Sequence, residues 1–302
     1  MPGRQEAGLA RQRSVMDDQT YPIHRGEAGT LALPVTELML HFDGDALSDE
    51  SLVLLYGQSF AALSRHLTHF RVDPMIHARA SPEFGASVAE DWVADAIDDR
   101  RALHVELTSG ASPDTVGPWS MRWHVPGQWQ RKGVAALRLT WPVEFGLRRP
   151  AELERVFRGL SAALPDAWGS AGFAIEYDIR RVAPERDRTM RAWCGRYRGL
   201  VHRDFDEVMN SDVPSFTSAS WLNLLPASWN EVPAQSGPET MERLVKVSAE
   251  PTLGDRNRDE DVHGLAQLQS WLRDWLTVPE QLPGGMDEEA FLIWRDRFDS
   301  RS

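Results

Sequence analysis

Two stretches of the chain repeat the order strand, helix, strand, and this repetition limits the folds that the sequence can adopt. In the first, residues 38–42 alternate as in a strand, residues 49–68 place apolar side chains on one helical face, and residues 70–78 return as a strand. In the second, strands are expected near residues 135–142 and 173–179, with a helix from Pro150 between them. The order favours two related strand–helix–strand halves sharing an antiparallel sheet with packed helices, which is an α+β fold.

Other segments add to this outline. Ser48 is a plausible N-cap of the first helix, and a further helix is expected over residues 87–101. The glycines of "WGSAGFAIE" are expected at a turn that leads into a strand. Late in the chain, "MERLVKVSAE" is expected as a strand, whereas "LAQLQSWLRDWL" and "DEEAFLIWRDRFD" are expected as helices. Residues 1–28 are polar and aperiodic, so we expect a disordered tail followed by a single domain over residues 29–302.

Composition points to a cytoplasmic protein. Cys194 is the only cysteine, so the fold cannot depend on an intrachain disulfide. The first residues lack the apolar core of a signal peptide, and no apolar run is long enough to span a membrane.

The charge balance indicates which partners fit. A net charge of −12 argues against direct, sequence-independent binding of nucleic acid, which needs a basic surface. It is compatible with a basic protein partner. From residue 250 to residue 302 there are twelve acidic and six basic residues, so this end carries half of the net charge.

The chain lacks motifs of known chemistry. No nucleophile elbow, phosphate-binding loop or dinucleotide fingerprint occurs, and we expect no catalytic, cofactor or metal site. His66 and His69 form an H-x-x-H spacing, and His202, Asp204 and Asp206 alternate, but both spacings are unspecific. Cys194 is expected as an inert thiol in an apolar neighbourhood.

The segment "SFTSASWLNLLPASWNE", residues 215–231, holds two tryptophans. We expect Trp221, Leu222, Leu224 and Leu225 in the core, with Asn223 satisfying a backbone group. Trp229 is a candidate for a binding rim, because tryptophan is enriched among binding hot spots.

Five short motifs occur in order along the chain. They are "WPVEF" at 141–145, Gly172 with Phe173, a segment with Tyr197, Gly199, Leu200 and Asp204, "WLNLL" at 221–225, and Trp294 with Arg297 and Phe298. Together they resemble the type VI secretion immunity family, long known only as a domain of unknown function, over about residues 33–298. The chain departs from that family at Val201, where an acidic residue is usual, and after Leu225, where a double glycine is missing.

The resemblance implies an immunity protein, used in competition between bacteria. It would bind a cognate secreted toxic effector in the producer's cytosol and neutralise it by stoichiometric, non-catalytic inhibition. An acidic inhibitor suits a basic nuclease, because it can occupy the groove meant for phosphate. Two alternatives stay open: an effector-loading adaptor or chaperone of a secretion system, and an uncharacterised hydrolase that uses His202 and Asp204.

Acidic clusters are the candidate partner-binding surface, together with Trp229. They lie before and at the start of the first helix, on the expected second helix, and in a late loop: Asp43, Asp45, Asp49; Glu90, Asp91, Asp95, Asp98, Asp99; and Asp255, Asp259, Glu260, Asp261.

Overall fold

The computed structural model describes most of the chain between residues 21 and 298, with gaps. The described residues are 21, 23–26, 29–44, 47–72, 79–81, 102–112, 115–126, 134–164, 166–178, 183–202, 205, 216–226, 239–241, 243–273, 276, 278, 282 and 286–298. The helix expected over residues 87–101 lies outside them, as does most of the expected tail.

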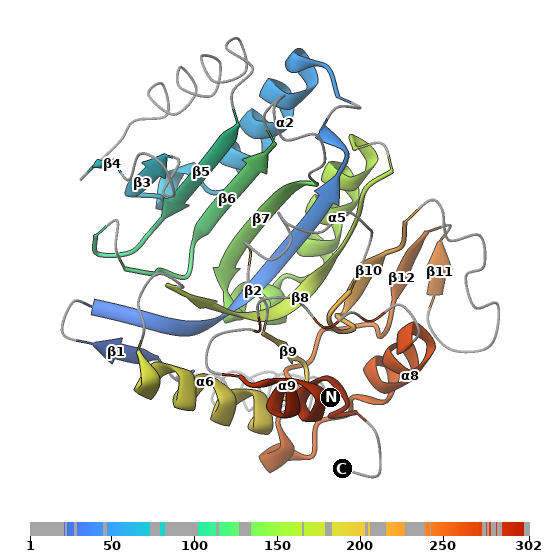
Figure 1. The fold of residues 1–302 in the computed structure, drawn as a ribbon. Coiled ribbons are helices and arrows are strands. Elements are labelled where there is room, and N and C mark those ends of the chain that lie inside the picture. Colours follow the sequence, from blue (N-terminus) through green and yellow to red (C-terminus); the bar gives the residue numbers. More distant parts are fainter. Residues whose placement is uncertain are drawn as a thin grey trace, which may run out of the picture.

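One open sheet of twelve strands forms the frame of the described part (Figure 1). The strands are β1 His24–Gly26, β2 Gly29–Phe42, β3 His69–Val72, β4 Arg79–Ser81, β5 Leu103–Thr108, β6 Ser120–Val125, β7 Ala135–Pro142, β8 Trp168–Tyr177, β9 Leu200–Val201, β10 Leu222–Leu224, β11 Glu239–Met241 and β12 Leu244–Lys246. Ten follow the order β11-β12-β10-β8-β2-β7-β6-β5-β3-β4, with β1 beside β2 and β9 beside β8. Every pairing is antiparallel except that of β8 with β9, so the predicted α+β class with an antiparallel sheet is confirmed.

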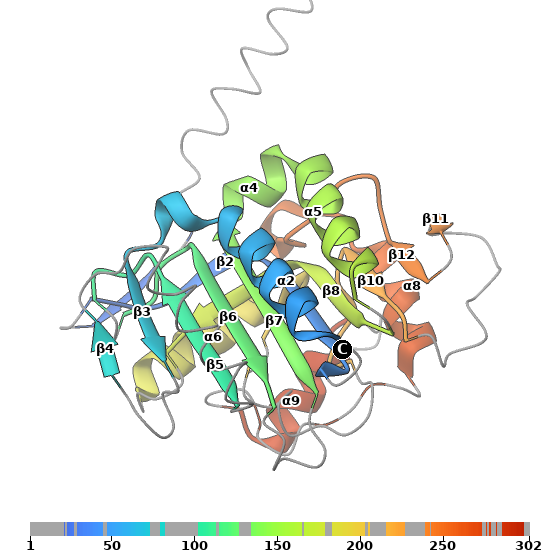
Figure 2. The same cartoon turned by 90° about the horizontal axis from the view of Figure 1, so that it is seen from above.

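Six α-helices pack around this sheet in the described residues, as Figure 2 shows from above. They are α2 Asp49–Ala61, α4 Val143–Arg148, α5 Pro150–Ala162, α6 Pro184–Arg196, α8 His263–Leu272 and α9 Glu288–Arg295, with short 3-10 turns η2 Ser64–His66 and η3 Arg256–Arg258.

Strand β2 is the centre of the sheet. Its residues from Leu31 to Phe42 are all buried, and it pairs with β7 on one side and β8 on the other. Parts of the chain more than 90 residues apart therefore meet at this strand, so the sheet depends on long-range pairing.

The main core lies between the sheet and the helices α2 and α5. On β2, Leu38, Leu40 and Phe42 point toward these helices, and β5, β6 and β7 add alternate apolar side chains to the same layer. Leu55 of α2 and Phe157 of α5 close the layer from the helix side. Because successive strand residues point to opposite faces, the residues between them form a second, distinct face.

Two further cores, larger than a small cluster of Met39, Ala136 and Phe205, hold other parts of the described chain. Helices α6 and α9 pack against the N-terminal half of β2 and the C-terminal half of β8, and their side chains Trp193 and Phe291 are buried there. Helix α8 packs through its leucines against Phe216, Leu225 and Val245. The strongly periodic helices expected near the C-terminus are thus confirmed.

Local signals predicted the helix starts well and one helix end poorly. The Ser48 side chain accepts a hydrogen bond from the backbone N–H of Ser51, which confirms it as the N-cap of α2. Pro150 is in the first turn of α5, as expected. Helix α2 ends at Ala61 rather than near residue 68, because the chain turns there through η2 into β3. His66 and His69 consequently lie on different elements and not on one helix.

The expectation that the glycines of "WGSAGFAIE" form a turn is wrong. All of these residues lie in β8. Gly169 has φ 157° and a Cβ there would lie 2.1 Å from the carbonyl oxygen of Met39, so only glycine fits so close to β2. The glycine marks close strand contact and not a change of direction.

Both strand–helix–strand units exist and share the sheet, but they are not equivalent in span. Antiparallel pairing through β7, β6 and β5 makes β2 and β3 parallel, with three strands between them. Only β2 separates β7 from β8.

Candidate functional site: a buried charge network and an acidic surface

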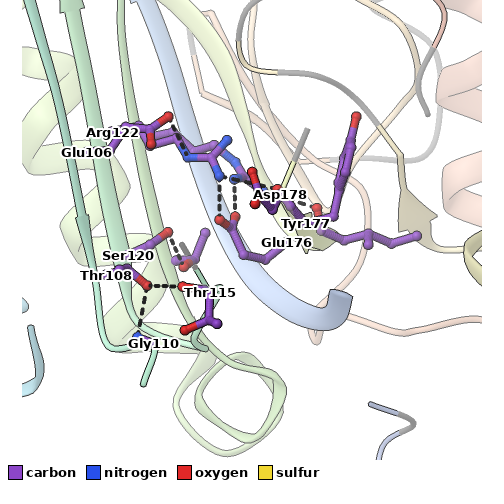
Figure 3. Close-up of polar contacts among 12 residues, drawn as sticks. Glu106, Thr108, Gly110, Thr115, Ser120, Arg122, Glu176, Tyr177 and Asp178 are labelled. Atoms are coloured by element: carbon purple, nitrogen blue, oxygen red, sulfur yellow. Dashed lines mark hydrogen bonds and ion pairs between the residues drawn. The ribbon is translucent and has the colours of Figure 1, made fainter. Parts of the chain in front are cut away.

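The second face of the sheet carries a row of buried charges. Arg138 on β7 donates from Nε to Glu37 on β2, with an N–O distance of 2.6 Å, and from Nη1 to Glu176 on β8. Arg122 on β6 donates to the other oxygen of Glu176 at 2.7 Å and has Glu106 of β5 at 3.8 Å (Figure 3). The network crosses five neighbouring strands.

The sheet register explains why Glu176 is needed. Arg122 and Arg138 lie directly opposite each other on β6 and β7, and like charges in that position repel. The carboxylate of Glu176 has one oxygen on each guanidinium, so it compensates for this repulsion. Burial alone would lower the pKa of Arg138, but the charges of Glu176 and Glu37 hold it above its usual value.

The charged groups of this arrangement are bound to one another inside the sheet. Each of these carboxylates is already held by a guanidinium, and Glu37, Glu176 and Arg138 are almost fully buried. Buried ion pairs gain little net stability, but a strand shifted by one residue would leave these charges unpaired inside the protein. The network therefore fixes the register of the central strands.

A polar turn borders the network where β5 leads to β6 (Figure 3). The hydroxyl of Thr108 accepts from the backbone N–H of Gly110 at 3.0 Å, and the hydroxyls of Ser120 and Thr140 lie 2.8 Å apart. The first bond satisfies a backbone N–H of the turn, and the second joins the side chains of two paired residues on β6 and β7.

Buried histidines lie beside the charge row, and the pKa values of two of them, His124 and His202, are lowered. His104 and His124 face each other across β5 and β6, with ring centres 5.8 Å apart. Burial, and then the charge of His104, lowers the pKa of His124 to about 3. Burial, and then the charge of Arg186, lowers the pKa of His202 to about 3, and its ring packs on Tyr177.

His202 is therefore a poor candidate for acid–base chemistry. Its side chain is fully buried, and a base with a pKa so far below neutral rarely carries a proton at pH 7. Its suggested partners Asp204 and Asp206 lie outside the described residues. Among the described residues, no group of three or more metal-ligating side chains is close enough to hold an ion.

Cys194 lies in the core beside α9, as expected from its apolar neighbours. Burial raises the pKa of its thiol to about 12, although Arg297 opposes this shift. The thiol is protonated at neutral pH and is not a nucleophile.

The tryptophan segment is largely core, as predicted. Trp221 and Leu222 are buried in the main core, and the Trp221 indole donates to the carbonyl of Ser248. The Asn223 side chain accepts from the backbone N–H of Ser220 and donates to the carbonyl of the same residue. Trp229 lies outside the described residues, so its place on a rim stays a prediction.

The other resemblance motifs also hold the fold together. Trp141 and Phe145 stack on each other between β7 and α4. Gly172 lies against the backbone of Trp221, and a Cβ on Gly199 would lie 2.4 Å from the carbonyl oxygen of Thr252.

Arg297 joins three of these motif segments. Its guanidinium donates to the carbonyls of Arg198 and Trp294 and to the hydroxyl of Ser218, and it stacks on the rings of Trp294 and Phe298. Burial lowers its pKa to about 9, partly offset by Cys194. The late "RF" motif thus ties the C-terminal helix to the segments that contain "YRGL" and "WLNLL".

Only some residues of the predicted acidic clusters lie in the part of the chain that the structure describes. Asp43 and Asp49 are exposed at the junction of β2 and α2, whereas Asp45 lies outside the described residues. The cluster on the expected second helix also lies outside them: Glu90, Asp91, Asp95, Asp98 and Asp99.

Two acidic residues of the late loop, Asp255 and Glu260, bind other groups of the protein. Asp255 is 4% exposed and forms an ion pair with Arg196 at 2.9 Å, which holds its pKa below the usual value. Glu260 accepts hydrogen bonds from the hydroxyl of Thr252 and from the backbone N–H of Asp255. Asp259 and Asp261 remain exposed, so they are the members of this cluster that a partner can reach.

Sequence reasoning missed the charge network and one surface. Charged Glu37 and Arg138 inside apolar strand runs were an available signal, because such residues need buried partners. The exposed side chains of Val53 and Leu54 on α2 were assigned no role, since helical periodicity alone does not show which apolar residue stays outside.

The described residues also bear on membrane insertion. None of their helices is both long and apolar enough to cross a bilayer.

Comparison with known proteins identifies the family. The family model described as type VI immunity for VRR-NUC, TsiV, matches residues 61–232, more than half of the chain. None of the curated proteins matches the sequence. The solved structure of Pseudomonas aeruginosa T6SS protein PA0821 superposes with a TM-score of 0.72 at 18% identity, covering 98% of this chain and 91% of that chain, and so shares its fold. The resemblance noted in the sequence is confirmed, and the chain belongs to the TsiV family of type VI immunity proteins.

Proposed function

We propose that this protein binds a cognate nuclease effector of the VRR-NUC type and neutralises it by stoichiometric, non-catalytic inhibition in the cytosol of the producing cell. The observation that supports the proposal is the family match over residues 61–232. An immunity protein has to reach its toxin before the toxin reaches the genome, so fast and tight association is the property that function demands.

The charge of the protein suits that task. A nuclease must bind the phosphate backbone, which requires Lys and Arg on its substrate surface. This chain carries a net charge of −12 and can present carboxylates where phosphates would lie. Opposite charges also accelerate encounter, by a factor that falls as salt is added.

The described chemistry supports binding rather than catalysis. The buried carboxylates are held by arginines, Cys194 is protonated, and His202 is enclosed. The polar groups described above thus stabilise the fold, and exposed surface remains for a partner.

The test is co-expression with the product of the adjacent gene, scoring survival and co-purification together. Rescue with a stable 1:1 complex is the expected result. Rescue without a complex would point instead to an enzyme that undoes the damage, and a complex without rescue would point to an adaptor. A catalytically inactivated effector, purified with the same tag, controls for toxicity during the purification.

A further inference from the structure

Helix α2 carries an outer surface that the described residues leave uncovered. Val53 and Leu54 are 44% and 62% exposed, and they are two of only five large apolar side chains exposed among the described residues. They are neighbours in sequence and face outward, while Leu52, Leu55 and Phe60 of the same helix are buried. Figure 2 shows α2 lying across the outside of the sheet.

Helical geometry extends this surface into a stripe. Glu50, Leu54, Gly57 and Ala61 repeat every three or four residues, so they line one side of the helix with Val53 beside them. We call these five residues the α2 stripe. Its end near the helix N-terminus is acidic, and its middle and far end are apolar and small.

Gly57 supports a role for this stripe. Glycine inside a helix costs about 1 kcal/mol relative to alanine. A Cβ at Gly57 would have no atom of the described residues within 4 Å, so packing in this part of the chain does not require glycine there. A small residue with open space above it allows another backbone to approach closely.

We propose that the α2 stripe is a docking surface for the nuclease effector, with Leu54 at its centre. The inference rests on the proposed function and adds the place of contact. The partner is identified by its charge: helix α2 contains Asp49 and Glu50 and no basic residue, and Asp43 precedes it. A basic, phosphate-binding surface with an apolar spot complements an apolar centre with an acidic border.

The experiment compares two variants of equally exposed residues. Leu54 on α2 and Ile293 on α9 are each 62% exposed, so Leu54→Arg and Ile293→Arg place the same charge at matched sites. Binding to the inactivated product of the adjacent gene is measured by calorimetry, with thermal unfolding as the check on folding. We expect Leu54→Arg to weaken binding by about tenfold or more and Ile293→Arg to change it by less than about twofold.

A second variant separates docking from folding. Gly57→Gln adds a good helix former over open space, so the free protein should be at least as stable while binding weakens. Asp49→Asn with Glu50→Gln should slow association and flatten its salt dependence more than it changes dissociation.

The outcomes distinguish this inference from the proposed function. If the unaltered protein forms no complex, the proposed function fails and the docking surface fails with it. If it forms a complex that Leu54→Arg and Gly57→Gln leave within about twofold, only the docking surface is wrong. A dimeric free protein that Leu54→Arg converts to a monomer would show that a second copy, and not the effector, covers the stripe.

Discussion

The substitution Arg138→Met should remove the central guanidinium of the buried charge network and destabilise the protein. Arg138 is 3% exposed and donates to Glu37, Glu176 and the carbonyl of Ile175. Methionine fills a similar volume but leaves Glu37 and Glu176 without that guanidinium. Removing one partner of a buried ion pair costs about 3–5 kcal/mol.

The structure sets the expected value within that range. Glu176 retains Arg122 after the substitution, so it stays partly compensated. We therefore expect a loss near the lower end, about 3 kcal/mol at pH 7. For a domain whose total stability is about 5–15 kcal/mol, this is a large fraction.

Urea unfolding followed by tryptophan fluorescence measures the change, since the midpoint and slope give the free energy of unfolding. Arg149→Met is the matched control: Arg149 pairs with Glu152 at 3.5 Å on the surface and should contribute at most about 1 kcal/mol. A loss below about 1 kcal/mol for Arg138→Met, or one equal to the control, would refute the reasoning.

Three further predictions follow from the surroundings of single residues. The pKa values of His124 and His202 are lowered to about 3, so below pH 6.5 the unfolded chain binds more protons than the folded protein. The free energy of unfolding should therefore decrease as the pH is lowered, by about 1.5 kcal/mol per histidine from pH 6.5 to 5. In urea titrations, His202→Phe should reduce this dependence on pH. Gly57→Ala should raise stability by about 1 kcal/mol, and Gly199→Ala should lower it by about 1–3 kcal/mol. In thermal unfolding, a loss for the first variant or a gain for the second would contradict the corresponding prediction. With its thiol pKa raised to about 12 by burial, Cys194 should resist iodoacetamide at pH 8 until urea unfolds the protein, as mass spectrometry would show; rapid labelling of the native form would mean an accessible thiol.

Local sequence signals predicted much of the fold. The Ser48 cap, the Pro150 start and the helices near the C-terminus depend on residues a few positions apart, and the structure confirms them. Trp221 and Asn223 were likewise placed correctly, because their pattern of apolar and amide side chains is local. The overall class followed from the repeated order of strands and helices.

What the sequence could not predict depends on distant pairing. Arg122 meets Glu176 across 54 positions, and no local pattern indicates which strands are neighbours. The prediction of a turn at Gly169 was wrong for the same reason, because glycine is required there by the close approach of the Met39 carbonyl in another strand. For the candidate site, the sequence located acids, but only the fold showed that Asp255 is enclosed and that Leu54 is exposed.

The central position of β2 has a consequence for the synthesis of the protein. β2 ends at Phe42, yet its partner β8 ends at Tyr177, roughly 135 residues later. At a translation rate of about 5–20 residues per second, the ribosome needs on the order of ten seconds to deliver that partner. Until β7 is complete at Pro142 the apolar strand β2 has neither of these two neighbours, and until Tyr177 it still lacks β8. An unpaired strand of this kind is a target for chaperones or for another nascent chain. A cell that needs its protection ready before the toxin is active gains by starting translation of this chain first.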